Sequence, residues 1–130
     1  MTLAAVHDSV VVTLHQGFAR VVLIYSLLVA IWGLFLYLRG RNPSGSYLGA
    51  LVINGGVVLL QALIGVTLAI QGYRPHDGLH FLYGVAALVT LPAAYLYSNG
   101  GTERRDSLVF GLGALFLFGI GIRAITTGAG

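Results

Sequence analysis

The chain of 130 residues contains no cysteine and very little charge, and both shortages narrow its class. Without cysteine it cannot form disulfides, thiolate metal sites or the covalent haem attachment of c-type cytochromes. Only 8% of its residues are charged, whereas soluble domains carry roughly 25%. Because 57% are hydrophobic, a soluble fold of this size could not bury the apolar surface that they present. The composition therefore excludes an ordinary soluble domain.

Other residue types are missing from the places where particular functions would need them. No acidic residue falls inside a hydrophobic run, which argues against a proton pump or an ion-coupled transporter. There is no phosphate-binding glycine loop, no Ser/His/Asp set and no pair of carboxylates, so hydrolytic chemistry has no support. The basic residues are all arginines, mostly in short loops and without a basic face, which excludes nucleic acid as a partner.

Long hydrophobic runs make up most of what is present. They cover residues 21–38, 47–71, 79–98 and 108–122, and their lengths lie around the roughly 20 residues that a membrane-spanning helix needs. The sequence predicts an all-α membrane protein with a single domain over residues 1–130, its spans near 12–38, 47–71, 79–98 and 107–126. Because the connections are short, we expect an antiparallel up-and-down four-helix bundle. The N-terminus lacks the basic region of a cleaved signal peptide.

Arginine positions predict the orientation of this bundle in the membrane. The first loop contains Arg39 and Arg41, and the third loop contains Arg104 and Arg105, whereas the second loop contains Arg74 alone. The positive-inside rule places the first and third loops in the cytoplasm. We therefore expect an integral protein of a prokaryotic cytoplasmic membrane, surrounded by the lipid bilayer, with both termini extracytoplasmic.

The chain also contains a tandem repeat of two-helix units. His15 and His80 both follow a leucine and lie 65 residues apart, as do Arg39 and Arg104. Each histidine precedes its arginine by 24 residues, about 36 Å of helix, which is a bilayer thickness plus some interface. Parallel repeats of this kind are known in membrane proteins. The repeat predicts that the two imidazoles face each other at equal depth on diagonal helices, near the outer end.

Two facing histidines favour a haem site, because a haem needs two neutral imidazoles at equal depth with a slot between them. We expect His15 and His80 to bind the iron of a haem b. Arg20 and Arg123 lie near the same end and could bind the two propionates, since arginine pairs well with carboxylates. Lipid headgroups are an alternative partner for both arginines. Glycines of the second and fourth spans are expected to leave the slot, namely Gly55, Gly56, Gly111, Gly113, Gly119 and Gly121. Close packing of the helices would explain the presence of these glycines equally well.

Two amides lie on one face of the second span. Asn54 and Gln61 are seven residues apart, at a depth where an unpaired amide is costly. Interhelical hydrogen bonding is the favoured interpretation for Asn54. For Gln61 the choice stays open between such a bond and a contact with a cofactor or with a histidine's second nitrogen.

Two further interpretations compete with haem. A copper, zinc or iron site at the outer face could draw on a cluster of histidine and aspartate side chains, namely His7, Asp8, His15, His76, Asp77 and His80. Alternatively, the histidines are interfacial residues, like Trp32, Tyr73 and Tyr83, in a cofactor-free accessory or structural subunit of a membrane complex.

The order of these motifs resembles one half of the haem A synthase family. The shared features are a histidine opening the first span, an arginine shortly after, "LRGR" in the inner loop, "LLQALIG" in the second span and a histidine opening the third. The resemblance covers about residues 14–98 and implies His15 and His80 as axial ligands, with Gln61 as the glutamine of the second-span motif. Only one four-helix half is present, and the family's outer glutamate and cysteines are missing.

The resemblance thus implies a small b-type cytochrome rather than a haem-modifying enzyme, and enzymatic activity is not assigned. We expect electron transfer or haem handling beside a larger membrane redox complex, or in a homo-oligomer.

Overall fold

The computed structural model describes the backbone of residues 3–75, 77–98 and 100–129, and the side chains of 10–75, 77–98 and 100–128. Within these ranges the chain is all-α, as predicted, with four helices and no strand. The helices are α1 (Leu3–Leu38), α2 (Gly45–Ile70), α3 (Leu79–Tyr97) and α4 (Arg104–Ala129).

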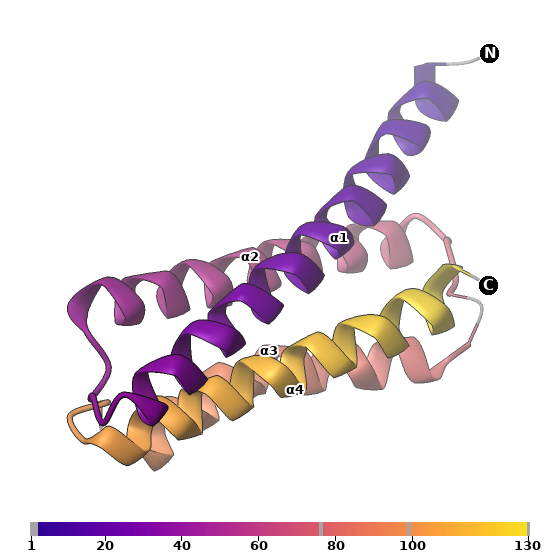
Figure 1. The fold of residues 1–130 in the computed structure, drawn as a ribbon. Helices are drawn as coiled ribbons and strands as arrows, with labels where there is room; N and C mark the ends of the chain where they lie inside the picture. Colours follow the sequence, from indigo (N-terminus) through magenta and orange to yellow (C-terminus); the bar gives the residue numbers. More distant parts are fainter. Residues whose placement is uncertain (1–2, 76, 99, 130) are drawn as a thin grey trace.

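Each helix contains a stretch long and apolar enough to cross a membrane: Val10–Leu38, Gly45–Ile70, Leu79–Tyr97 and Arg104–Gly128. The chain is therefore an integral membrane protein whose surroundings are the lipid bilayer. The expected spans fall within these helices, except for one residue at the end of the second and third. α1 begins well before its expected span, and its first turns project beyond the other helices (Figure 1).

Consecutive helices run antiparallel and form the predicted up-and-down bundle (Figure 1). α1 packs against α2 and α4, and α3 packs against the same two helices. The α1–α4 interface is the most extensive of the four and the α2–α3 interface the slightest. α1 and α3 thus lie on a diagonal of the bundle. We call the end with the α2–α3 loop and the C-terminus the histidine end, and the end with residues 39–44 and 98–103 the arginine end.

Glycines bring α1 and α4 into close contact. A Cβ atom added to Gly33 would lie 2.9 Å from the Cα atom of Gly111, and one added to Gly111 would lie 3.0 Å from the backbone nitrogen of Leu34. Small residues let membrane helices approach until their backbones touch. The hydrophobic core beside this contact includes Val29, Ala30, Phe110, Ala114 and Leu117.

Buried hydrogen bonds join α1 to α2. The Ser26 hydroxyl donates to Asn54 Oδ1 over 3.2 Å, and both side chains are fully buried. The Tyr47 hydroxyl donates to the carbonyl of Val29, and that of Tyr25 donates to the carbonyl of Ala50. The bond from Ser26 confirms the expectation that Asn54 makes an interhelical hydrogen bond. The Nδ2 atom of Asn54 is buried and has no hydrogen-bond partner among the described residues.

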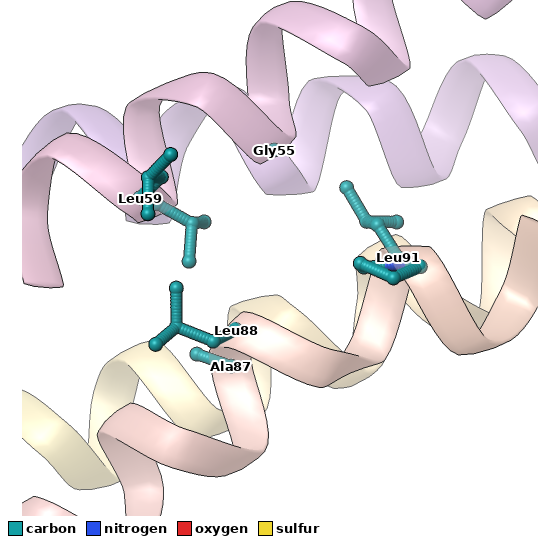
Figure 2. Close-up of a pocket in the computed structure, with 7 residues that line it drawn as sticks. Gly55, Leu59, Ala87, Leu88 and Leu91 are labelled. Carbon is teal, nitrogen blue, oxygen red and sulfur yellow. The ribbon is translucent and has the colours of Figure 1, made fainter.

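α2 and α3 are separated by an apolar cleft of about 240 Å³ (Figure 2). The side chain of Leu88 on α3 points across it toward α2. α3 continues as a helix through Pro92, which has no N–H to donate to the carbonyl four residues earlier. The cleft is lined by Gly55, Val58, Leu59, Ala87, Leu88, Leu91 and Pro92.

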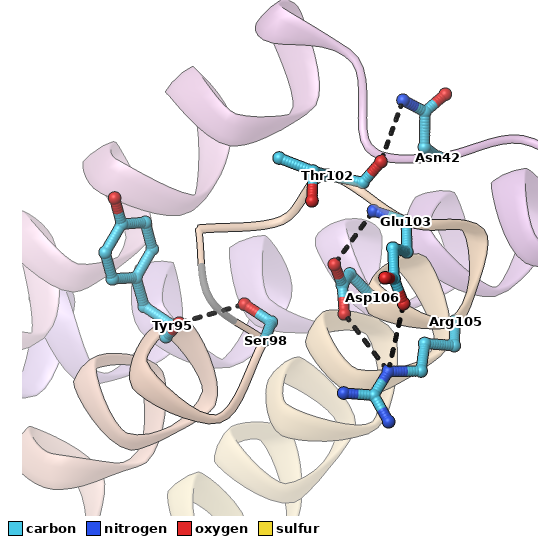
Figure 3. A network of polar contacts seen from close by, with 7 residues as sticks. All are labelled: Asn42, Tyr95, Ser98, Thr102, Glu103, Arg105 and Asp106. Carbon is cyan, nitrogen blue, oxygen red and sulfur yellow. Dashed lines mark hydrogen bonds and ion pairs between the residues drawn. The ribbon is translucent and has the colours of Figure 1, made fainter.

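Polar contacts hold the two loops of the arginine end together (Figure 3). The Asn42 side chain reaches the carbonyl of Thr102. The carboxylate of Asp106 is buried, and its Oδ2 atom accepts from the backbone N–H of Glu103 over 2.9 Å. Arg105 lies 3.7 Å from Asp106 Oδ1 and 3.5 Å from the Glu103 carboxylate. These contacts fix the start of α4.

Candidate functional site

His15 and His80 meet at the histidine end of the bundle. Their ring centroids are 6.1 Å apart and the ring planes cross at 77°. Both side chains are partly buried, one from α1 and the other from α3. The diagonal placement of these helices therefore brings the imidazoles together, as the 65-residue repeat predicts.

The ring of His80 is fixed by α4. Its Nδ1 atom lies 2.8 Å from the carbonyl oxygen of Ala124, so Nδ1 carries the proton and donates it. This leaves Nε2 with its lone pair. The start of α3 is also fastened, since the N–H of Asp77 donates to the carbonyl of Thr127 over 2.7 Å, and Asp77 Oδ1 accepts from the N–H of Leu79.

Gln61 of α2 contacts both the backbone and the ring of His15. The Gln61 amide donates to the carbonyl oxygen of His15 over 2.7 Å. The backbone of Gln61 also interacts with the imidazole, but the Nδ1 atom of His15 is buried without a hydrogen bond of good geometry. Gln61 Oε1 is buried and unpaired as well among the described residues. The bond to the histidine backbone shows an interhelical role for Gln61 and leaves its role toward a cofactor a prediction.

Each histidine ring faces the backbone of one residue on a neighbouring helix and packs on the glycine four residues later. For His80 these residues are Ala124 and Gly128 of α4, and for His15 they are Gln61 and Gly65 of α2. A Cβ added to Gly128 would lie 2.7 Å from His80 Cε1, and one added to Gly65 would lie 3.1 Å from His15 Cε1. The segments are "QALIG" on α2 and "AITTG" on α4. An i, i+4 spacing puts the facing carbonyl and the glycine on one side of the helix. Gly65, Ala124 and Gly128 were not among the residues expected at this site, although the two segments occupy nearly equivalent places in the repeat.

None of the glycines expected to form the slot lies against either histidine ring, and their role toward a cofactor stays a prediction. Gly111 packs against α1, Gly121 against Leu23, and Gly55 lines the α2–α3 cleft. A Cβ on Gly113 would contact α3 side chains, and one on Gly56 or Gly119 would meet nothing within 4 Å. Gly65 lies four residues after Gln61 and so shares the face that the amides of α2 mark, a signal that could have pointed to it. Gly128 follows Ala124 and Gly121 at the same helical spacing, and these residues mark no face.

The arginines expected to bind propionates take up different positions. Arg123 Nε lies 3.4 Å from the hydroxyl of Tyr83, and its guanidinium is 5.9 Å from that ring's centroid. Arg20 is exposed on α1 and makes no hydrogen bond or ion pair within the described part of the chain. Arg74 donates to the carbonyls of Ala69 and Tyr73 at the end of α2. The binding roles of Arg20 and Arg123 stay predictions.

The side chains that could bind a metal limit which cofactor fits the site. No group of three or more His, Cys, Asp or Glu residues could hold a metal ion within the ranges that the structure describes. Residue 76 and the side chains of residues 7 and 8, proposed above for a metal cluster, lie outside those ranges. Structural zinc needs four protein ligands, whereas a porphyrin brings four nitrogens of its own and needs only two axial ligands.

The spacing of the rings fits that requirement. A metal bonded to one nitrogen of each ring, at about 2 Å, would place the centroids roughly 6 Å apart. The observed separation is 6.1 Å. The buried, unpaired Nδ1 atom of His15 shows that the described residues do not complete the polar contacts of this site.

No family model, curated protein or solved structure matches the chain.

Proposed function

We propose that the protein is a membrane b-type haem-binding protein in which His15 and His80 are the axial ligands. The observation that supports this most is the pair of imidazoles 6.1 Å apart on diagonal helices. A bis-histidine haem supplies one-electron redox chemistry, and its potential depends on the ligands and on their hydrogen bonds. The motif resemblance to one half of haem A synthase leads to the same assignment.

The residues around the pair would prepare the ligands before the cofactor arrives. The carbonyl of Ala124 selects the tautomer of His80 and makes its second nitrogen more basic, as outer partners of metal-binding histidines do. The Gln61 amide holds the backbone of His15. Arg20 and Arg123 are the candidates for the propionates. Arg123 already lies beside Tyr83 at the histidine end, which is the end where a charged edge could meet water.

The distribution of arginine supports an orientation with the arginine end in the cytoplasm. Arg39, Arg41, Arg104 and Arg105 all lie at that end, so the histidine pair and both termini would face the extracytoplasmic side. A haem there would exchange electrons with a partner at the outer surface. That partner would be a larger membrane redox complex or a second copy of the chain.

Absorption spectroscopy tests the proposal directly. Protein expressed with adequate haem and purified in detergent should be red, with a sharp Soret band and bis-histidine features. His80→Ala should lose most of the haem, whereas Thr67→Val, an exposed change on α2, should keep it. Colourless wild-type protein would overturn the proposal in favour of a cofactor-free accessory subunit. Unchanged haem content in His80→Ala would overturn the ligand assignment.

A further inference from the structure

The arginine end carries four arginines, and the acidic side chains of that end lie beside only one of them. Arg105 lies 3.5 Å from the Glu103 carboxylate and 3.7 Å from that of Asp106. Arg39 and Arg41 are exposed, and their side chains make no hydrogen bond or ion pair within the part of the chain that the structure describes. The loop between α1 and α2 therefore presents two positive charges without a counter-ion from the protein.

The backbone that carries these two arginines is fixed by the end of α1. Gly40 adopts the left-handed conformation, with a φ of 72°, and its N–H donates to the carbonyl of Tyr37 over 3.0 Å. The N–H of Arg41 donates to the carbonyl of Leu36 over 2.9 Å, which completes a common helix-ending motif. From α4, the hydroxyl of Ser107 donates to the carbonyl of Arg41 over 2.8 Å. The unpaired side chains thus start from a loop whose shape is set in advance.

Arg104 of α4 adds a third guanidinium group to the same loop. Its Nε atom donates to the carbonyl of Tyr37 over 2.9 Å, and its guanidinium lies 4.4 Å from the centre of the Tyr37 ring. A Cβ added to Gly40 would lie 3.9 Å from this Nε atom. The terminal nitrogens of Arg104 make no hydrogen bond or ion pair with the described residues, so they can donate to a ligand.

Next to Arg39, one face of α1 is aromatic and open to lipid. Trp32 and Phe35 precede Arg39 by seven and four residues, so all three share this face. The Arg39 guanidinium lies 5.7 Å from the centre of the Phe35 ring. Phe35 is 54% exposed and Trp32 is 36% exposed. Positive charge at the end of an exposed apolar face is complementary to a molecule that joins a phosphate to hydrocarbon chains.

We propose that the arginine end binds the phosphate group of an anionic phospholipid. Arg39 and Arg41 are its main contacts, and Arg104 lies beside them. An acyl chain of the same lipid lies along Phe35 and Trp32. Guanidinium groups bind phosphate oxygens in bidentate pairs, and basic residues next to membrane spans attract anionic lipids. Inorganic phosphate would meet the charge but leave the aromatic face uncovered, so the lipid is the assigned ligand. The proposal does not depend on haem, since the histidine pair lies at the opposite end of the bundle.

The single tryptophan of the chain, Trp32, allows a direct test. Bromine atoms on an acyl chain quench the fluorescence of a tryptophan that the chain touches. The full chain is reconstituted in vesicles of phosphatidylcholine and phosphatidylglycerol, with first one lipid and then the other brominated. Phosphatidylglycerol should occupy the site about fivefold or more above its share of the vesicle lipid. Quenching in proportion to each lipid's share would overturn the proposal.

Variants test which arginines give this preference. The double variant Arg39→Gln, Arg41→Gln should quench equally with both lipids, and its fold should be unchanged because neither side chain has a hydrogen-bond or ion-pair partner among the described residues. Arg74→Gln is the control, since it removes the same charge at the histidine end and should keep the preference. A preference retained in the double variant, or lost equally in Arg74→Gln, would overturn the assignment of these residues.

A last arm distinguishes the lipid from free phosphate. Sodium phosphate and sodium chloride at equal ionic strength should weaken the preference for phosphatidylglycerol equally, because both act by screening. A clearly larger loss in phosphate would show that the site takes the free anion and would overturn the assignment of a lipid.

Discussion

The α1–α4 and α2–α3 interfaces both join apolar membrane-spanning helices, but the first is tightly packed and the second is loosely packed. Across α1–α4, Gly33 meets Gly111, and the two backbones touch. Across α2–α3, Gly55 faces leucines over an open cleft of about 240 Å³. Lipid chains are as apolar as leucine, so no hydrophobic drive closes a poorly fitting interface in a membrane. A small residue brings helices together only where its partner is also small.

The largest effect is expected from breaking the tight interface. Gly33→Leu would drive a side chain into the Tyr47 hydroxyl and the Gly111 backbone, which cannot move aside cheaply. We expect a loss of about 1–3 kcal/mol or more of bundle stability, as overpacking costs in cores. Thermal unfolding of the purified protein, first shown to elute as a monodisperse species, measures this loss of stability. Gly49→Leu is the control, because a Cβ there meets nothing. Equal stability of both variants would contradict the close contact.

A smaller effect is expected at the histidine end, where His80 packs more tightly on its glycine than His15 does. Gly128→Ala should displace His80 and lower haem affinity about tenfold, whereas Gly65→Ala should have less effect because His15 lies farther from its glycine. Haem titration of apoprotein gives both affinities. Gly119→Ala, whose added Cβ meets nothing within 4 Å, should match the wild type. Equal losses in all three variants would indicate a general glycine effect instead.

The smallest effect is expected from filling the loose interface. Gly55→Leu adds a side chain to the open cleft, so we expect a stability change below about 1 kcal/mol, far less than for Gly33→Leu. The same thermal unfolding assay compares the two directly. A loss as large as that of Gly33→Leu would show that α2 and α3 close on each other in the membrane.

The sequence predicted the features that depend on periodicity and length. Four apolar runs indicated four spans, and the equal spacing of His15 and His80 from their arginines indicated that the rings would share a depth. The interhelical role of Asn54 followed from the cost of an unpaired amide in a bilayer. Gly128, which receives the ring of His80, could not be predicted, because Ala124 and Gly121 precede it at helical spacing and do not mark an inward face. Gly65 lies four residues after Gln61, on the face that the two amides mark, so the sequence did offer a signal for it.

The position of Arg20 shows the same limit. Its separation of five residues from His15 turns it to another side of α1, and it is exposed. The pairing of Arg123 with Tyr83 joins residues 40 positions apart, which only the packing of α3 on α4 brings together.

Composition and spacing by themselves thus determined a four-span membrane bundle and the common depth of two histidines, since span length and helical rise are local properties of the chain. Tertiary structure alone decided that His80 is hydrogen-bonded to α4 while His15 depends on Gln61. That difference comes from how the helices are rotated about their axes, which depends on the shape of neighbouring side chains rather than on the hydrophobic pattern of any one helix.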